Sequence, residues 1–189
     1  MARERKREHI YEEHAYVLDY LLHGRPGTRP YRAGALVQVV GEDYFTLLEA
    51  VVKADVTVRL YDRIYVGRES RDVVTQVLGR IGYDELTSSA RVELEPAVER
   101  IVLRREEYFV RFFNTCQAVT PRMHSLELIP GIGKKFMWQI LDEREKRPFQ
   151  SLEELQKRAN LPKPTKLIAR RVLDELAGKS KYRLFTRPD

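Results

Sequence analysis

The chain has 189 residues, of which 43% are hydrophobic and 33% charged, and it carries a net charge of +6 and a single cysteine, Cys116. This composition is sufficient for a packed core, whereas the lack of any apolar run of about 18 residues argues against a membrane-spanning helix. One cysteine excludes an internal disulfide framework and a multi-cysteine metal cluster. Together with the lack of a membrane-spanning helix, this leads us to expect a cytoplasmic protein with no membrane partner.

The first module is predicted to be a small β-barrel of the OB or SH3-like kind, covering residues 1–69. Five short apolar segments, rich in valine, tyrosine, threonine and leucine and separated by turn-forming residues, indicate antiparallel strands. The predicted strands are 14–22, 35–40, 44–53, 56–60 and 64–67.

The predicted barrel carries aromatic and basic residues that could hold a single strand or RNA by base stacking and phosphate pairing. These residues are Tyr31, Tyr44, Phe45, Tyr61 and Tyr65, with Arg25, Arg29, Arg32, Arg59 and Arg63. Because residues 1–70 hold 11 basic and 11 acidic side chains, the module is uncharged, and a protein partner bound through the barrel is the alternative.

Residues 70–119 are predicted to form a helical connecting region. Helices are expected over 72–78 behind a Ser70 cap, over about 87–94, and from Pro96, which suits the first turn of a third helix. An aromatic cluster at helical spacing is predicted to pack in the core between the modules. Its members are Tyr108, Phe109, Phe112 and Phe113.

Four helices are predicted in residues 120–189 from their capping residues. The first begins at Thr120, which precedes a proline, and ends near Leu128. The second runs from about 133 to 144, and a capping box at Ser151 opens the third. The fourth begins at Thr165 and ends before Gly178.

This final third carries the positive charge of the chain, with 16 basic and 9 acidic residues in 121–189. A localised basic surface favours binding to a polyanion. An internal repeat with an offset of 32 residues accompanies the charge: Ile129-Pro130 aligns with Leu161-Pro162, and Lys134 aligns with Lys166. The repeated unit is a helix, a tight turn and a second helix.

The sequence Leu126-Glu-Leu-Ile-Pro-Gly-Ile-Gly-Lys-Lys135 resembles the helix-hairpin-helix motif, whose core is an aliphatic residue followed by Pro-Gly-aliphatic-Gly and basic residues. With its continuation through residues 140–155, it resembles the tandem version found in DNA-uptake and DNA-repair proteins. The chain as a whole resembles an uncharacterised archaeal family that joins an N-terminal barrel to such a tandem domain. The resemblance implies that residues 120–189 form a tandem helix-hairpin-helix domain that holds duplex DNA.

The physical basis of this binding is that a phosphate can lie against a helix N-terminus only where the backbone comes close and its amides are free. Gly131 and Gly133 have no side chains that would hold a phosphate away, and the amides of residues 133–135 should point outward. The predicted site in this hairpin comprises Pro130, Gly131, Ile132, Gly133, Lys134 and Lys135. The alternative is an ordinary helical hairpin with glycine at its turn.

The second hairpin departs from the motif, because Lys163, Pro164 and Thr165 stand where the first has glycine, isoleucine and glycine. Pro164 has no N–H to donate, so side chains would have to hold phosphates here. The residues predicted to do so are Lys163, Thr165, Lys166, Arg170 and Arg171. The alternative is a solvated face in which Arg170 pairs with Asp174.

We do not expect an enzyme. Resemblance to base-excision glycosylases would make Lys135 a catalytic lysine, but the aspartate that those enzymes require further along is missing, and Glu153 and Glu154 are better explained as a helix cap. The four histidines lack metal-ligand spacing, so no catalytic residue, metal or cofactor is predicted. The sequence predicts a nucleic-acid-binding protein, with DNA favoured over RNA. The rival hypothesis is a protein-interaction module of a ribosome or DNA-repair assembly.

Overall fold

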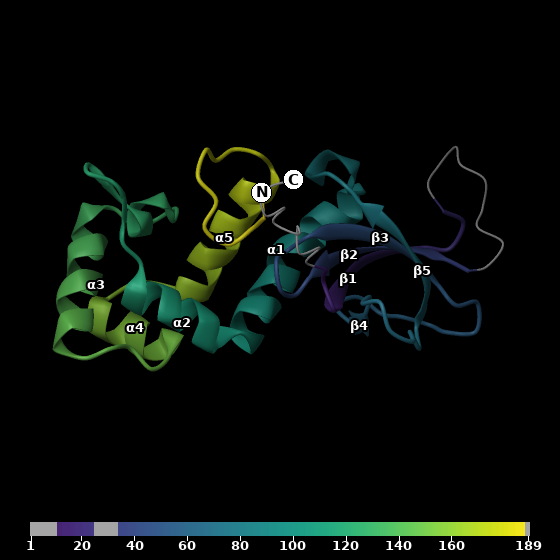
Figure 1. Cartoon of the computed structure of the whole chain (residues 1–189), viewed down its shortest axis with the longest axis horizontal. Coiled ribbons are helices and arrows are strands. Elements are labelled where there is room, and N and C mark those ends of the chain that lie inside the picture. The colour runs from purple at the N-terminus through teal and green to yellow at the C-terminus, as the bar shows by residue number, and fades with distance from the viewer. Residues whose placement is uncertain (1–10, 25–33, 188–189) are drawn as a thin grey trace, which may run out of the picture.

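The computed structural model describes residues 11–24 and 34–187, which form a mixed α+β structure. A curled antiparallel sheet lies at one end of an elongated molecule, and helices α3 and α4 lie at the other (Figure 1). Helices α1 and α5 lie between them and pack against each other. The α+β class expected from the sequence is therefore confirmed.

The sheet has five strands in the order β4-β1-β2-β3-β5, and every neighbouring pair is antiparallel. The strands are β1 (His14–Leu21), β2 (Leu36–Gly41), β3 (Leu47–Val52), β4 (Arg63–Tyr65) and β5 (Val74–Arg80). Register shifts occur in the pairing of β1 with β2 and of β3 with β5, and such irregularities increase strand bending. The edge strands β4 and β5 do not pair with each other, so the sheet is a half-barrel.

Both faces of the central strands are covered, because successive side chains point to opposite faces and β2 and β3 are buried along their whole length. One face contributes Tyr16, Leu18, Val40 and Leu47 to a large cluster shared with the helices. The other face contributes Val17, Val39, Ala50 and other residues to a separate cluster inside the curl. The large cluster holds the sheet against α1.

Two of the predicted elements in this region are wrong. Residues 56–60, expected to be a strand, have no regular structure, and residues 72–78, expected to be a helix, belong mainly to β5. Val74 is buried in the cluster inside the curl, and the ladder with β3 pairs the backbone groups on one side of β5. Tertiary packing of β-branched residues therefore overrides the local helix signal at Ser70, and the sheet extends past the boundary predicted at residue 69.

The helices expected over 87–94 and from Pro96 are one helix, α1 (Ser88–Arg104). Thr87 caps it, because its side chain accepts a hydrogen bond from the amide of Ala90 at 3.0 Å. Pro96 lies inside the helix, which continues because its buried face carries on past the proline with Val98 and Ile101. A second helix, α2 (Glu106–Thr115), follows directly.

The helix predicted over 120–128 is wrong, and a short hairpin takes its place. Strands β6 (Ala118–Thr120) and β7 (Met123–His124) are followed by the 3-10 helix η2 (Ser125–Leu128). The Thr120 hydroxyl accepts a hydrogen bond from the amide of Arg122 at 3.3 Å, which closes a turn in place of capping a helix. Burial lowers the pKa of His124, and its Nδ1 accepts from the amide of Leu126 and so caps η2.

The remaining helices follow their predictions closely. They are α3 (Lys134–Lys146), α4 (Leu152–Ala159) and α5 (Pro164–Leu176). Ser151 caps α4 as expected, because its hydroxyl accepts from the amide of Glu154 at 3.0 Å. Gly178, at which α5 was expected to stop, has a φ of +69° and follows the end of the helix.

One hydrophobic core runs through all three predicted modules. Phe45 of the sheet region lies 6.3 Å from Phe109 of α2, measured between ring centroids. Phe185 of the C-terminal tail packs edge-on against Phe109 and Phe112, at 5.3 and 4.9 Å. The predicted core role is confirmed for Phe109 and Phe113, which are fully buried, whereas Tyr108 is partly exposed.

Cys116 provides a test of this core, because it is buried and desolvation raises the pKa of its thiol. We expect the native protein to react with a thiol reagent such as DTNB at least about a hundredfold more slowly than the unfolded chain. Absorbance at 412 nm in buffer and in guanidinium chloride measures the two rates. Comparable rates would contradict the burial of Cys116.

In the described part of the chain, no helix combines the length and apolar character needed to cross a membrane. Among the same residues, no three histidine, cysteine, aspartate or glutamate side chains are grouped so that they could hold a metal ion.

Candidate functional site

The turn between η2 and α3 is anchored by buried isoleucines and exposes its glycines. Ile129 and Ile132 are buried, and the amide of Ile132 donates to the carbonyl of Ile129 at 3.0 Å. Gly131 and Gly133 are exposed. Gly131 has a φ of +94°, and a Cβ there would meet Leu167 Cδ2 of α5 at 2.9 Å. Backbone conformation and the contact with α5 therefore both favour glycine at residue 131.

The N-terminus of α3 carries backbone amides without acceptors. Gly133 is the N-cap residue and has no capping side chain, in contrast to Thr87 at α1 and Ser151 at α4. Within the described residues, no hydrogen-bond acceptor faces the amides of Gly133, Lys134, Lys135 or Phe136. The first intrahelical bond is donated by the amide of Met137 to the carbonyl of Gly133, at 2.9 Å. The exposed start of α3 is therefore ready to bind an anion.

Three exposed side chains lie in the first turns of α3, next to these amides in sequence. Lys134 and Lys135 occupy the first turn of α3, and Trp138 follows one turn later with 59% of its surface exposed. Residues three and four apart lie on the same helix face, so Trp138 lies beside both lysines. Trp138 was not identified as a site residue from the sequence. Its position four residues after Lys134 and three after Lys135 could have placed it on the same helix face as the lysines.

The second turn, between α4 and α5, lacks this arrangement. Lys163 adopts a left-handed conformation, with a φ of 48°, at the position equivalent to Gly131. Pro164 is buried and has no N–H, and the amide of Lys166 already donates to the carbonyl of Lys163 at 3.0 Å. Lys163, Thr165 and Lys166 line a groove that also contains carboxylates. Those carboxylates are Glu99, Glu106 and Glu153. Because these carboxylates repel an anion, the groove is less favourable for anion binding than the start of α3.

Lys166 and Arg170 also face a carboxylate. Lys166 Nζ and Arg170 Nε each lie 3.8 Å from Oε1 of Glu95 on α1. The pairing of Arg170 with Asp174, considered from the sequence, is replaced by this contact. Because Arg170 keeps about half of its side chain exposed, it can still face a bound ligand.

The prediction that Arg171 binds nucleic acid is wrong. Its side chain is 4% exposed and pairs with the buried Glu175, with Nε 2.8 Å from Oε1. Its guanidinium also donates to the carbonyls of Leu128, at 2.8 Å, and Tyr182. Arg171 therefore joins α5 to η2 and to the C-terminal tail, and it cannot reach a ligand at the surface.

The aromatic residues predicted to stack bases on the barrel are largely engaged inside the molecule. Phe45 is fully buried, so its predicted role is wrong. Tyr61 lies under the Arg100 guanidinium, Tyr65 packs edge-on against His14, and Tyr44 lies under Arg187. Arg63 pairs with Glu42, whereas Arg59 is exposed. Tyr31, Arg25, Arg29 and Arg32 lie outside the described residues.

These features define an α+β protein in which a curled five-stranded sheet packs against helices, one of which exposes an uncapped N-terminus flanked by lysines. The chain belongs to the family described as "Protein of unknown function (DUF655)", whose model matches residues 11–187.

Two archaeal proteins are similar to this chain over most of its length. The uncharacterized protein MJ0038 of Methanocaldococcus jannaschii is 41% identical over 179 residues, which are 94% of this chain and 81% of that protein. The crystal structure of Af1531 from Archaeoglobus fulgidus is similar with a TM-score of 0.86 at 43% identity, covering 93% of this chain and 100% of that chain. This similarity confirms the arrangement of sheet and helices.

Proposed function

We propose that this protein is a non-enzymatic nucleic-acid-binding protein that holds the phosphate backbone at the start of α3 and does not read base sequence. The observation that carries the proposal is the set of four amides, of Gly133, Lys134, Lys135 and Phe136, that are without an acceptor at an exposed helix start. Duplex DNA is the favoured ligand and RNA the alternative. Contacts to phosphates position a protein on nucleic acid without specifying a sequence.

The binding step follows from the chemistry of this helix start. A phosphate oxygen accepts hydrogen bonds from amides at the N-terminus of α3, where the helix dipole favours negative charge. Gly133 lets the oxygen approach, because nothing lies within 4 Å of where its Cβ would be. The flexible side chains of Lys134 and Lys135 then neutralise neighbouring phosphates, and Trp138 can pack against the sugar.

The internal repeat supports a tandem helix-hairpin-helix arrangement as part of this proposal. Gly131 and Lys163 both have positive φ, and the equivalent pairs Ile129 with Leu161 and Ile140 with Val172 are buried. The first unit is η2 with α3, and the second is α4 with α5. We interpret the first unit as the phosphate-binding one and the second mainly as its support. In the same interpretation, the half-barrel is a relative of the OB or SH3-like barrels.

Salt dependence tests the proposal. If about four to six phosphates are contacted, log affinity should fall linearly with log salt with a slope of about −4 to −5. Fluorescence anisotropy of a labelled 20-bp duplex between 50 and 300 mM salt measures the slope. Trp138 is the single tryptophan of the chain and lies one turn from the site, so its fluorescence should change during the same titration.

The rival function, a protein-interaction module, makes the opposite prediction. Such a module would leave both signals unchanged when duplex DNA or RNA is added at 50 mM salt. That outcome would exclude nucleic acid as the ligand.

A further inference from the structure

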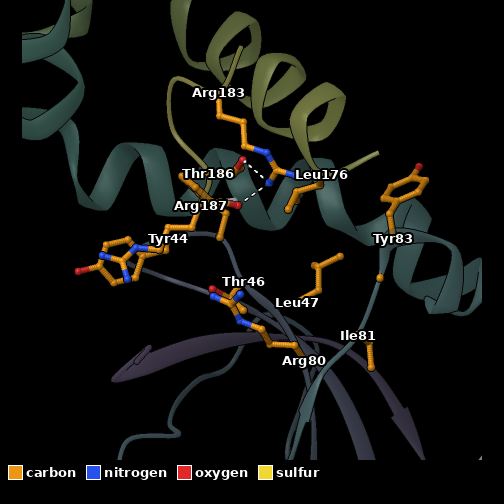
Figure 2. A pocket seen from close by; sticks show the side chains of 12 residues that line it. Tyr44, Thr46, Leu47, Arg80, Ile81, Tyr83, Leu176, Arg183, Thr186 and Arg187 are labelled. Carbon is orange, nitrogen blue, oxygen red and sulfur yellow. Dashed lines mark hydrogen bonds between the residues drawn. The ribbon is translucent and has the colours of Figure 1, made fainter. Parts of the chain in front are cut away.

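A small basic pocket lies between the end of the sheet and the C-terminal tail (Figure 2). Arg80 reaches it from β5, while Arg183 and Arg187 come from the tail on the opposite side. Among the described residues that line it there is no aspartate or glutamate. The guanidinium of Arg187 lies 3.5 Å from the ring centroid of Tyr44, which fixes its position. Arg183 also donates to the Thr186 hydroxyl at 3.4 Å and to the carbonyl of Arg187. Three guanidinium groups beside one hollow favour a phosphate group.

A buried carboxylate holds the tail in place. Glu175 of α5 accepts hydrogen bonds from the amides of Leu184, Phe185 and Thr186, at 2.7, 3.1 and 2.9 Å. Phe185 is buried against α2. The two tail arginines therefore extend from an anchored segment, and the pocket is a formed site.

A second hollow connects this pocket to the candidate site. Pro130 of the first hairpin lines it, together with Arg170 and Lys179. Tyr83, the first residue of the 3-10 helix η1 (Tyr83–Glu85) that follows β5, lines both hollows. A path of basic side chains therefore leads from the hairpin, past the partly exposed ring of Tyr83, to the pocket of three arginines. The guanidinium of Arg91 lies over this ring, 5.5 Å from its centroid. One carboxylate, that of Asp174, lies along the second hollow.

We infer that this path binds a single-stranded segment of nucleic acid that continues from a duplex held at α3. The inference rests on the proposed function and extends it to a junction between duplex and single strand. Phosphates occupy the two basic hollows, and one unpaired base stacks on Tyr83. Bases inside a duplex are stacked on each other, so only an unpaired base can use this ring.

The test compares a blunt 20-bp duplex with the same duplex bearing a tail of about ten thymidines, at the 5′ or the 3′ end. We expect one tailed duplex to bind about tenfold more tightly than the blunt one. Tyr83→Ala should remove most of this gain, while Tyr83→Phe keeps it because the ring remains. Tyr20→Ala, at an exposed tyrosine of β1, is the matched control and should keep the gain.

Arg80→Glu provides a variant that does not depend on the packing of Tyr83, because Arg80 is exposed. It should remove the tail-dependent gain without changing binding of the blunt duplex. Equal affinities for blunt and tailed duplexes, or a gain that survives both Tyr83→Ala and Arg80→Glu, would overturn the inference. Binding of the blunt duplex is judged separately: its absence would overturn the proposed function, and with it the junction.

Discussion

Replacing Gly133 with aspartate is expected to lower the affinity for duplex DNA about a hundredfold while the fold keeps or slightly gains stability. The aspartate carboxylate would accept the amides of Lys135 or Phe136, as aspartate does at many helix starts, and would repel phosphate. Losing two hydrogen bonds to a charged phosphate, at about 1.5 kcal/mol each, gives about 3 kcal/mol, or about a hundredfold.

The structure indicates that the variant will fold. Gly133 has φ and ψ of −86° and −176°, which is extended backbone that any residue adopts. No atom lies within 4 Å of the position of its Cβ. Aspartate is also a better N-cap than glycine by a few tenths of a kcal/mol, so the midpoint of thermal unfolding should stay the same or rise.

Ser151→Asp is the matched control for this variant. It adds the same charge at another N-cap in the helical region, at α4, where a side chain already accepts from the amide of Glu154. The control should keep DNA affinity within about threefold at moderate salt, because exposed charges more than about 10 Å apart are largely screened. Anisotropy and circular dichroism measure affinity and stability. If both variants lost affinity equally, the effect would be general repulsion, and α3 would not be the site.

Replacing Arg171 with alanine is expected to cost about 3–5 kcal/mol of the free energy of unfolding. Removing one partner of a buried ion pair leaves an uncompensated charge, here that of Glu175, whose side chain is fully buried. The same change also removes the donors to the carbonyls of Leu128 and Tyr182. A loss of this size is a large share of the stability of a typical domain.

The neighbouring arginine supplies the control. Arg170→Ala removes an exposed side chain whose ion pair with Glu95 spans 3.8 Å, so stability should change by less than about 1 kcal/mol. Urea unfolding followed by circular dichroism compares the two variants. An Arg171 variant as stable as the Arg170 variant would show that the buried contacts of Arg171 are not the ones described.

Much of the helical region follows from local chemistry that the sequence displays. Ser151 begins α4, the segment containing Gly131 and Gly133 forms the turn, and Gly178 follows the end of α5. Caps and turn residues act over three or four positions, so a single sequence contains the whole signal. The candidate site lies in this part of the chain, which is why its glycines and lysines could be predicted.

The elements that were missed depend on contacts distant in sequence. Strand β5 forms because Val74 and Val77 pack inside the curl of the sheet and pair with β3, which the local sequence does not display. The hairpin that replaces the helix expected at Thr120 rests on a bond that is longer in range than a helix cap, because the amide of Ser125 donates to the carbonyl of Gln117, eight residues earlier. Tertiary pairing decides such segments.

The error at Arg171 had a signal in the sequence. Leu167 and Ile168 are buried, and residues three and four positions later lie on the same helix face. Arg171 and Glu175 fall on that face at a spacing of four, which is the spacing of an ion pair. The prediction for the second hairpin was made from charge alone. It therefore grouped Arg170, which faces solvent, with Arg171, which faces the core.

Backbone amide chemical shifts test the central claim most directly. In a titration of uniformly 15N-labelled protein with duplex DNA, the amides of Gly133, Lys134, Lys135 and Phe136 should move downfield more than those at the start of α4. Downfield movement is expected because these protons gain charged acceptors. If the duplex binds while these four amides stay in place and resonances elsewhere shift, phosphate binding at the start of α3 is contradicted.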